Sequence, residues 1–94
     1  MRLSKSDKNF IEDICDMMQD QYVAGKIIRK KIPTYKQAEK ELFENCLNAV
    51  IILAEAFDYT QEKIDAFSRY IDKYNKDEIG IMLDEIEMDV KWVK

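Results

Sequence analysis

The chain has 94 residues, 47% of them hydrophobic and 36% charged, with a formal net charge of −4. A chain of this length forms a single domain, residues 1–94, and its hydrophobic share argues against disorder. Only two glycines and one proline occur, which excludes the many turns of a sandwich or barrel and predicts an all-α fold. No segment reaches the roughly 18–20 apolar residues that cross a bilayer, so we expect no membrane partner.

Side chains that commonly carry catalysis or bind metals are scarce. The absence of histidine removes the commonest general base and transition-metal ligand. Cys15 and Cys46 are far apart, and without a Cys-x-x-Cys motif we expect no metal site and no cofactor. Each cysteine falls on an apolar helical stripe, which favours a small buried side chain over a disulfide or a nucleophile. Such cysteines, and the lack of a signal peptide, indicate a reducing cytoplasm.

The two halves of the chain differ in charge. Residues 1–47 hold nine basic and eight acidic side chains, whereas residues 48–94 hold six and eleven. The acidic C-terminal half opposes nonspecific binding of nucleic acid there. Lysine, isoleucine, asparagine and tyrosine are enriched, as AT-rich codons produce, which indicates a low-GC genome such as that of a Firmicute or one of its phages.

The first predicted helix covers about residues 6–31. Ser4 or Ser6 can cap it, and acidic side chains in its first turns complement the helix dipole. Gly25 inside the helix indicates either a bend or a close approach of another backbone. Pro33 ends the helix, because the residue before a proline is pushed out of the α region.

The second predicted helix runs to about residue 57. It begins with Thr34 as N-cap and Gln37 three positions later, a capping box that marks a helix start. Its second half is apolar on nearly all sides, and a helix of this kind is covered on most sides. We therefore expect it at the centre of the fold or in a subunit interface.

Two shorter helices are predicted after a brief connection. They cover residues 61–74 and about 78–90, and the polar run Asn75-Lys76-Asp77 is predicted to form the turn between them. Loops this short place neighbouring helices antiparallel. The predicted fold is a four-helix arrangement with a long N-terminal helical hairpin and two shorter C-terminal helices.

The last predicted helix carries two apolar stripes. The first, which suits the protein's own core, comprises Ile79, Met82, Leu83, Ile86, Val90 and Val93. The second lies nearly opposite. Either the helix ends near Val90 and Trp92 folds back onto the core, or the second stripe contacts a dimer mate or another partner. Because tryptophan is a frequent hot spot and methionine adapts to varied surfaces, we predict partner binding through Ile81, Glu85, Met88 and Trp92.

Basic side chains gather at the end of the first helix, namely Lys26, Arg29, Lys30 and Lys31. Cations at a helix C-terminus complement its dipole. Alternatively, the cluster contacts the phosphates of a nucleic acid or of a nucleotide messenger. The scarcity of arginine counts against base-specific reading, which favours bidentate arginine contacts.

Carboxylates form two patterns, and neither predicts a metal site. Acidic residues at positions 41, 44, 55 and 58 superficially resemble the paired motifs of all-α nucleotide pyrophosphohydrolases, but here they share one helix and cannot surround a cation. A second group lacks the ligand alternation and the glycine of an EF-hand; its members are Asp84, Glu85, Glu87 and Asp89. It is either a solvated helix face or a surface that docks onto a basic partner.

Three consecutive segments carry a family resemblance: an apolar helix around residues 51–53, an amphipathic helix with a phenylalanine over residues 59–67, and an acidic helix over residues 79–86. In this order they resemble the C-terminal part of small uncharacterised helical proteins of Firmicute phages and mobile elements. The resemblance implies a phage accessory protein and brings no known activity or functional residues.

These features predict a non-enzymatic, helical protein-binding module in the cytoplasm of a bacterial host cell. We expect a phage or mobile-element accessory protein that inhibits or modulates a host protein, such as a defence effector. Self-association is also expected, since a chain this short buries little surface by itself. The alternative is a nucleic-acid-associated regulator that uses Lys26, Arg29, Lys30 and Lys31.

Overall fold

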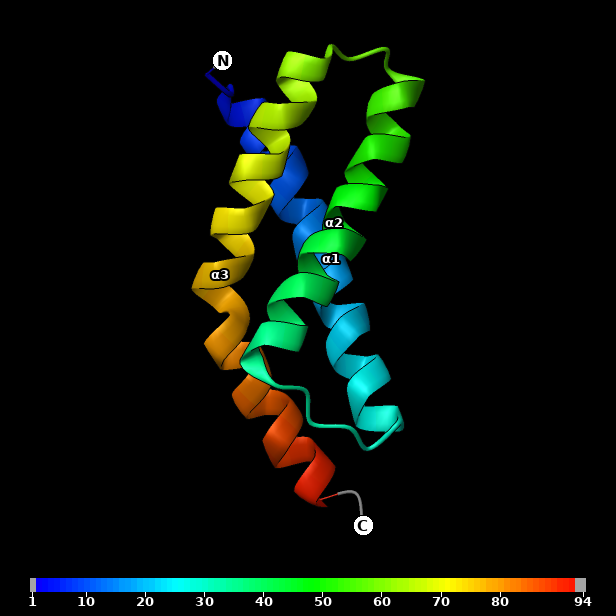
Figure 1. Ribbon diagram of the computed structural model, residues 1–94, viewed down its shortest axis with the longest axis vertical. Coiled ribbons are helices and arrows are strands. Elements are labelled where there is room, and N and C mark those ends of the chain that lie inside the picture. Colours follow the sequence, from blue (N-terminus) through cyan, green and yellow to red (C-terminus); the bar gives the residue numbers. More distant parts are fainter. Residues whose placement is uncertain (1, 93–94) are drawn as a thin grey trace.

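The structure, a computed structural model, describes residues 2–92 as a bundle of three helices (Figure 1). They are α1 (Lys5–Ile28), α2 (Tyr35–Ala56) and α3 (Gln61–Trp92). Helices α1 and α3 run in the same direction, and α2 runs the opposite way. No strand occurs in residues 2–92, which confirms the predicted all-α class. Within the same residues, no helix is long and apolar enough to cross a membrane.

The predicted four-helix arrangement is wrong, because the two C-terminal helices are one continuous helix. The Asn75-Lys76-Asp77 segment, predicted as a turn, lies in the middle of α3. Asparagine favours turns where its side chain competes for backbone hydrogen bonds. Here the Asn75 side chain is hydrogen-bonded inside the core, so this competition is absent. Lys76 lies on the outside, with its Nζ 2.9 Å from an Asp72 oxygen and 3.6 Å from a Glu39 oxygen.

A layer of polar contacts joins all three helices inside the core. Nε2 of Gln19 in α1 donates to Oδ1 of Asn75 in α3 at 2.9 Å, and Sγ of Cys46 in α2 donates to the same oxygen at 3.9 Å. Nδ2 of Asn75 is buried and has no hydrogen-bond partner among residues 2–92. Cys15 and Cys46 are free and buried, as predicted, and contact with Cys46 together with burial raises the pKa of Cys15.

Two apolar clusters flank this polar layer along the bundle. The cluster nearer the start of α1 contains Ile11, Ile14, Cys15, Cys46, Val50, Phe67 and Ile71. The cluster nearer the end of α1 contains Tyr22, Val23, Ala38, Leu42, Ile79, Met82 and Ile86. Each cluster takes side chains from all three helices, so neither is complete until α3 has packed against the hairpin of α1 and α2.

The helix ends follow local sequence signals. A capping box starts α1 at Ser4, and the predicted capping box starts α2 at Thr34. Helix α1 ends at Ile28, earlier than predicted, because Lys30 adopts a left-handed φ of 54°. The N–H groups of Lys30 and of the next residue bond back to the last turn, which closes a Schellman motif. Asp58, with a φ of 58°, ends α2 in the same way.

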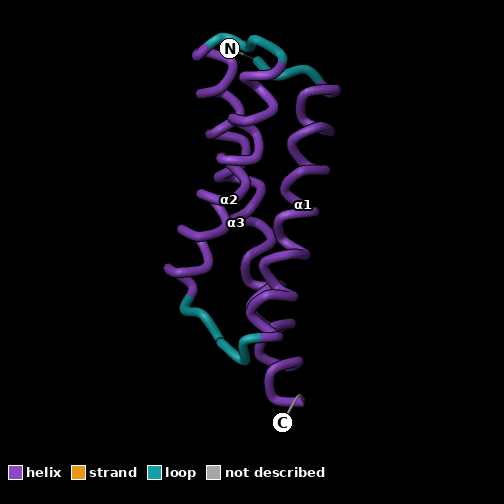
Figure 2. Tube along the Cα trace, turned by 90° about the vertical axis from the view of Figure 1, so that its right-hand side faces the viewer, coloured by secondary structure: helices purple, strands orange, loops and turns teal. Residues whose placement is uncertain are grey.

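Helix α3 continues beyond the end of α1. Two hydrogen bonds join residues that are 58 positions apart, from Tyr70 to Glu12 at 2.6 Å and from Tyr74 to Asp16 at 2.7 Å. At this offset Ile28, the last residue of α1, is level with residue 86 of α3. Residues 87–92 therefore project past α1 by about 9 Å, because a helix rises 1.5 Å per residue. The end of α3 also passes the connection between α1 and α2 (Figures 1 and 2).

The Asn75→Ala variant is expected to lower the free energy of unfolding by about 1–3 kcal/mol, because it leaves the buried Gln19 amide without its acceptor. The double variant Gln19→Leu/Asn75→Leu removes both polar groups and should recover most of that loss. Urea denaturation followed by circular dichroism measures both effects. An Asn75→Ala protein as stable as the parent would show that the polar layer does not stabilise the bundle.

Candidate protein-binding surface

The predicted second stripe of α3 is exposed to solvent. The exposed fraction is 67% for Ile81, 62% for Met88 and 83% for Trp92, and Glu85 between them is exposed as well. Trp92 lies within the helix and does not fold back onto the core. The first stripe faces the core, as predicted, with Ile79, Met82 and Ile86 buried. Val93, which the sequence also places on that stripe, lies outside the described residues.

The exposed stripe lies on a side of α3 that contacts α1 nearer the start of α3. Tyr74, Ile81 and Met88 are seven residues apart, so they lie almost on one line along the helix. At Tyr74 the hydroxyl donates to Asp16 of α1 at 2.7 Å. Ile81 and Met88, further along this line, are largely exposed. The stripe is thus the part of this side that α1 leaves uncovered.

Most of the exposed large apolar side chains lie at one end of the bundle. We define the distal end as residues 28–36, which form the end of α1 and the start of α2, together with residues 81–92 of α3. Of the nine large hydrophobic side chains that are exposed within residues 2–92, six belong to it: Ile28, Ile32, Tyr35, Ile81, Met88 and Trp92. Met17, Ile52 and Phe57 lie elsewhere. The distal end therefore carries the stripe and a second group of exposed apolar side chains.

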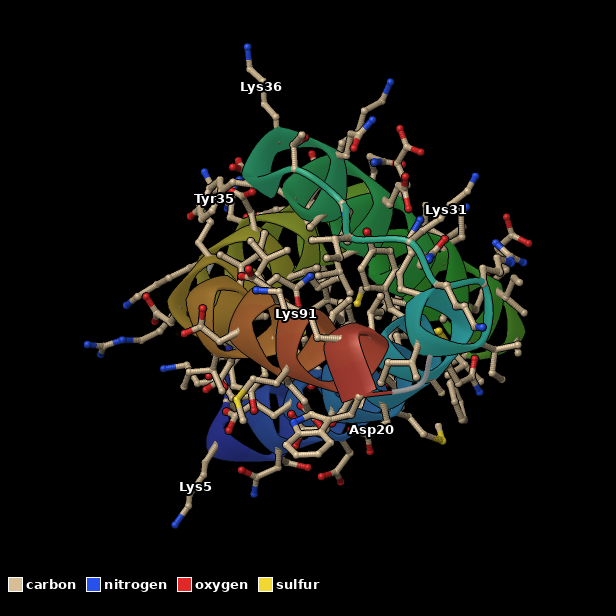
Figure 3. The ribbon with its side chains drawn as sticks, turned by 90° about the horizontal axis from the view of Figure 1, so that it is seen from below. Lys5, Asp20, Lys31, Tyr35, Lys36 and Lys91 are labelled. Atoms are coloured by element: carbon tan, nitrogen blue, oxygen red, sulfur yellow. The ribbon has the colours of Figure 1, made fainter. Side chains whose placement is uncertain are left out.

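Charges of opposite sign occupy the two parts of the distal end. Exposed basic side chains surround the connection between α1 and α2, namely Arg29, Lys30, Lys31 and Lys36. Acidic side chains flank the stripe on α3, namely Asp84, Glu85, Glu87 and Asp89. Seen along the bundle axis, Lys31 and Lys36 point outward from the connection, while Lys91 lies on the last turn of α3 (Figure 3).

The predicted basic cluster is only partly available for a ligand. The side chain of Lys26 is 14% exposed, and its Nζ lies 3.0 Å from an Oε2 of Glu41. This ion pair lowers the pKa of Glu41. Arg29, Lys30 and Lys31 remain exposed, so three of the four predicted phosphate contacts are accessible.

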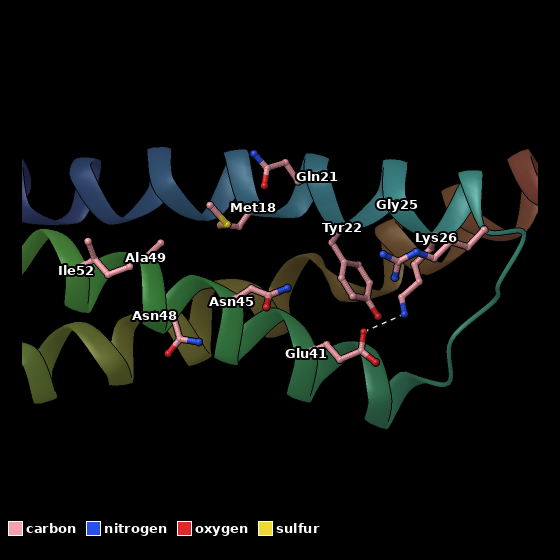
Figure 4. A pocket seen from close by; sticks show the side chains of 11 residues that line it. Met18, Gln21, Tyr22, Gly25, Lys26, Glu41, Asn45, Asn48, Ala49 and Ile52 are labelled. Carbon is pink, nitrogen blue, oxygen red and sulfur yellow. Dashed lines mark ion pairs between the residues drawn. The ribbon is translucent and has the colours of Figure 1, made fainter.

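A groove of about 500 Å³ between α1 and α2 was missed by the sequence reasoning (Figure 4). Tyr22 points from α1 across to α2, where burial and then the charge of Glu41 raise the pKa of its hydroxyl. A Cβ added at Gly25 would meet no atom within 4 Å, so no backbone approaches this glycine closely. The available signal was the three amides that line the groove: Gln21, Asn45 and Asn48.

The carboxylates do not converge on a metal position. No group of three or more cysteine, aspartate or glutamate side chains in residues 2–92 could hold a metal ion. Glu41 is engaged by Lys26, and Glu87 by Lys91 at 2.8 Å.

No protein family, curated protein or solved structure matches this chain. The exposed stripe and its charged surroundings are thus the features that indicate a function.

Replacing Trp92 with alanine should change the free energy of unfolding by no more than about 0.5 kcal/mol, because the indole is exposed. The contrasting variant is Phe67→Ala, which removes a fully buried ring and should cost about 3–5 kcal/mol. Urea denaturation measures both. Trp92 is the only tryptophan. Because its indole is already exposed, the emission maximum of dilute protein should shift little on unfolding. A large destabilisation by Trp92→Ala would place the indole in the core.

The stability of the protein should fall as the pH rises above about 10. The hydrogen bond to Glu12, helped by burial, raises the pKa of Tyr70 from 10.0 to about 12. A tyrosine whose folded pKa is raised contributes stability below its unfolded pKa, and that contribution is lost as the pH rises from about 10 to 12. Denaturant midpoints over this range should fall more steeply for the parent than for Tyr70→Phe. Equal slopes would contradict the contribution of this hydrogen bond.

Proposed function

We propose that this protein is a non-enzymatic helical module that binds another protein through the exposed stripe Ile81, Glu85, Met88 and Trp92. The observation that supports the proposal is the exposure of three large apolar side chains in line on one helix. Exposed apolar side chains gathered in one place are typical of interaction sites on small soluble proteins. Tryptophan is enriched among the residues that dominate binding energy.

The chemistry of the stripe indicates the kind of surface that it fits. Acidic side chains flank the apolar line on both sides, so the complementary surface is an apolar groove or helix face with a basic rim. Burying a large apolar side chain contributes about 1.5–3 kcal/mol, whereas association costs an estimated 4–15 kcal/mol. Three side chains roughly offset the lower end of that cost. The rest of the distal end must therefore contribute to a stable complex.

The biological setting comes from the sequence. The resemblance of residues 47–90 to small proteins of Firmicute phages, together with the low-GC composition, supports an accessory protein of a phage or mobile element. Such a protein would act in the cytoplasm of the bacterial host and would inhibit or modulate a host protein. The alternative is a nucleic-acid-associated regulator. Lys26 is held by Glu41, and the acidic end of α3 lies at the same end of the bundle, so the structure favours this alternative less.

The test is capture of host proteins by the tagged chain, with and without nuclease. The variant Met88→Ser/Trp92→Ser removes the stripe, and Ile52→Ser removes an apolar side chain of similar exposure, 68%, from α2. We expect at least one low-GC host protein to bind the parent and Ile52→Ser but not the stripe variant, regardless of nuclease.

Two outcomes would contradict the proposal. Capture that survives in Met88→Ser/Trp92→Ser would place the binding surface elsewhere on the molecule. Capture that collapses after nuclease treatment, and that falls steeply with salt, would favour nucleic-acid binding through Arg29, Lys30 and Lys31. Circular dichroism of each variant confirms that the helices are retained.

A further inference from the structure

We infer that the distal end also binds a second copy of this chain, related by a two-fold axis, with the α3 tip of each copy on the α1–α2 connection of the other. This inference rests on the proposed function, namely that the stripe binds protein. It adds an identical copy as a second partner of the stripe, and a second, basic contact surface. A two-fold interface must be self-complementary, because the same surface serves both copies.

The charges of the distal end meet this requirement. Its basic half consists of Arg29, Lys30, Lys31 and Lys36, and its acidic half includes Asp84, Glu85 and Asp89. In residues 2–92 none of these seven side chains has an ion-pair partner within 4.0 Å. Each half therefore offers unpaired charges that are opposite in sign to the unpaired charges of the other half. Reciprocal docking would pair them twice in one dimer.

The apolar side chains are divided between the same two halves. Ile28, Ile32 and Tyr35 accompany the basic side chains, and Ile81, Met88 and Trp92 accompany the acidic ones. The two most exposed of the six are Ile28 at 79% and Trp92 at 83%, one from each half. Docking one half onto the other would bury apolar surface on both, and the two-fold axis doubles that burial.

The acidic charge decides how two copies meet. Ile81, Glu85, Met88 and Trp92 have the alternating four- and three-residue spacing of a coiled-coil seam, which by itself would allow two α3 helices to pair. That pairing would bring Glu85 and its acidic neighbours of both copies together, and like charges across an interface oppose association. Docking of the acidic α3 tip on the basic connection between α1 and α2 brings opposite charges together instead. Residues 87–92 project past α1 and are free to reach it.

The test uses reversal of charge in each half. One variant, Lys30→Glu/Lys31→Glu, makes the connection acidic, and the other, Glu85→Lys/Asp89→Lys, makes the α3 tip basic. Sedimentation velocity over a range of concentrations measures self-association, and the fluorescence of Trp92 reports burial at the tip itself. We expect the parent to form a dimer and each variant alone to associate about 100-fold more weakly or worse.

An equimolar mixture of the two variants should dimerise again. In the mixed pair both contacts join opposite charges, although each variant repels itself. The control Lys5→Glu/Lys73→Glu changes the net charge by the same amount as Lys30→Glu/Lys31→Glu, outside the distal end, and should dimerise like the parent. Thermal unfolding of each protein confirms that association, rather than folding, has changed.

Three outcomes would overturn the inference: a monomeric parent at every concentration, a Lys30→Glu/Lys31→Glu protein that still dimerises, or a mixture that does not recover. If the parent is monomeric while stripe-dependent capture of a host protein persists, the proposed function stands and only the second copy is refuted. If the parent is monomeric and no stripe-dependent capture occurs, both fail.

Discussion

The hydrogen bond between Gln19 and Asn75 is the constraint on which the rest of the structure depends. It lies between two apolar clusters, and the thiol of Cys46 on the remaining helix donates to the same oxygen. The hydrogen bonds of a buried amide can form at few positions in a core. The amide therefore favours one alignment of the helices over the others that apolar packing would allow. That register aligns α3 with α1 and determines how far the end of α3 projects.

The projection of α3 links the core to the surface. Because α1 stops at Ile28 in a Schellman motif, α3 passes it by more than a turn and its last residues lack a helical neighbour. On the same side of α3, Tyr70 and Tyr74 are held by carboxylates of α1. Further along this side, Ile81 is exposed although α1 still runs beside it, and Met88 and Trp92 lie beyond the end of α1. This side of α3 is thus half-buried beside α1 at Tyr70 and Tyr74 and exposed at the stripe.

A small bundle of this kind gains from association. Short chains bury a modest fraction of their surface on folding. Their free energy of unfolding is small, so each additional contact is a considerable share of it. Here the exposed apolar side chains lie mostly at one end, where basic and acidic side chains occupy separate halves. From this separation we propose two complements for the surface, an apolar partner with a basic rim and the other half of an identical copy.

The sequence by itself determined the helical class, the capping boxes, the burial of the two cysteines and the two-sided apolar pattern of residues 79–92, because these follow from local chemistry and periodicity. The tertiary structure decided that Asn75 lies in a helix, that Trp92 stays exposed, that Lys26 is held by Glu41 and that α1 and α2 enclose a groove. An asparagine followed by lysine and aspartate is typical of a turn, but here a distant glutamine donates to the Asn75 oxygen inside the core. Such long-range pairing has no signature in the neighbouring residues, so only packing could reveal it.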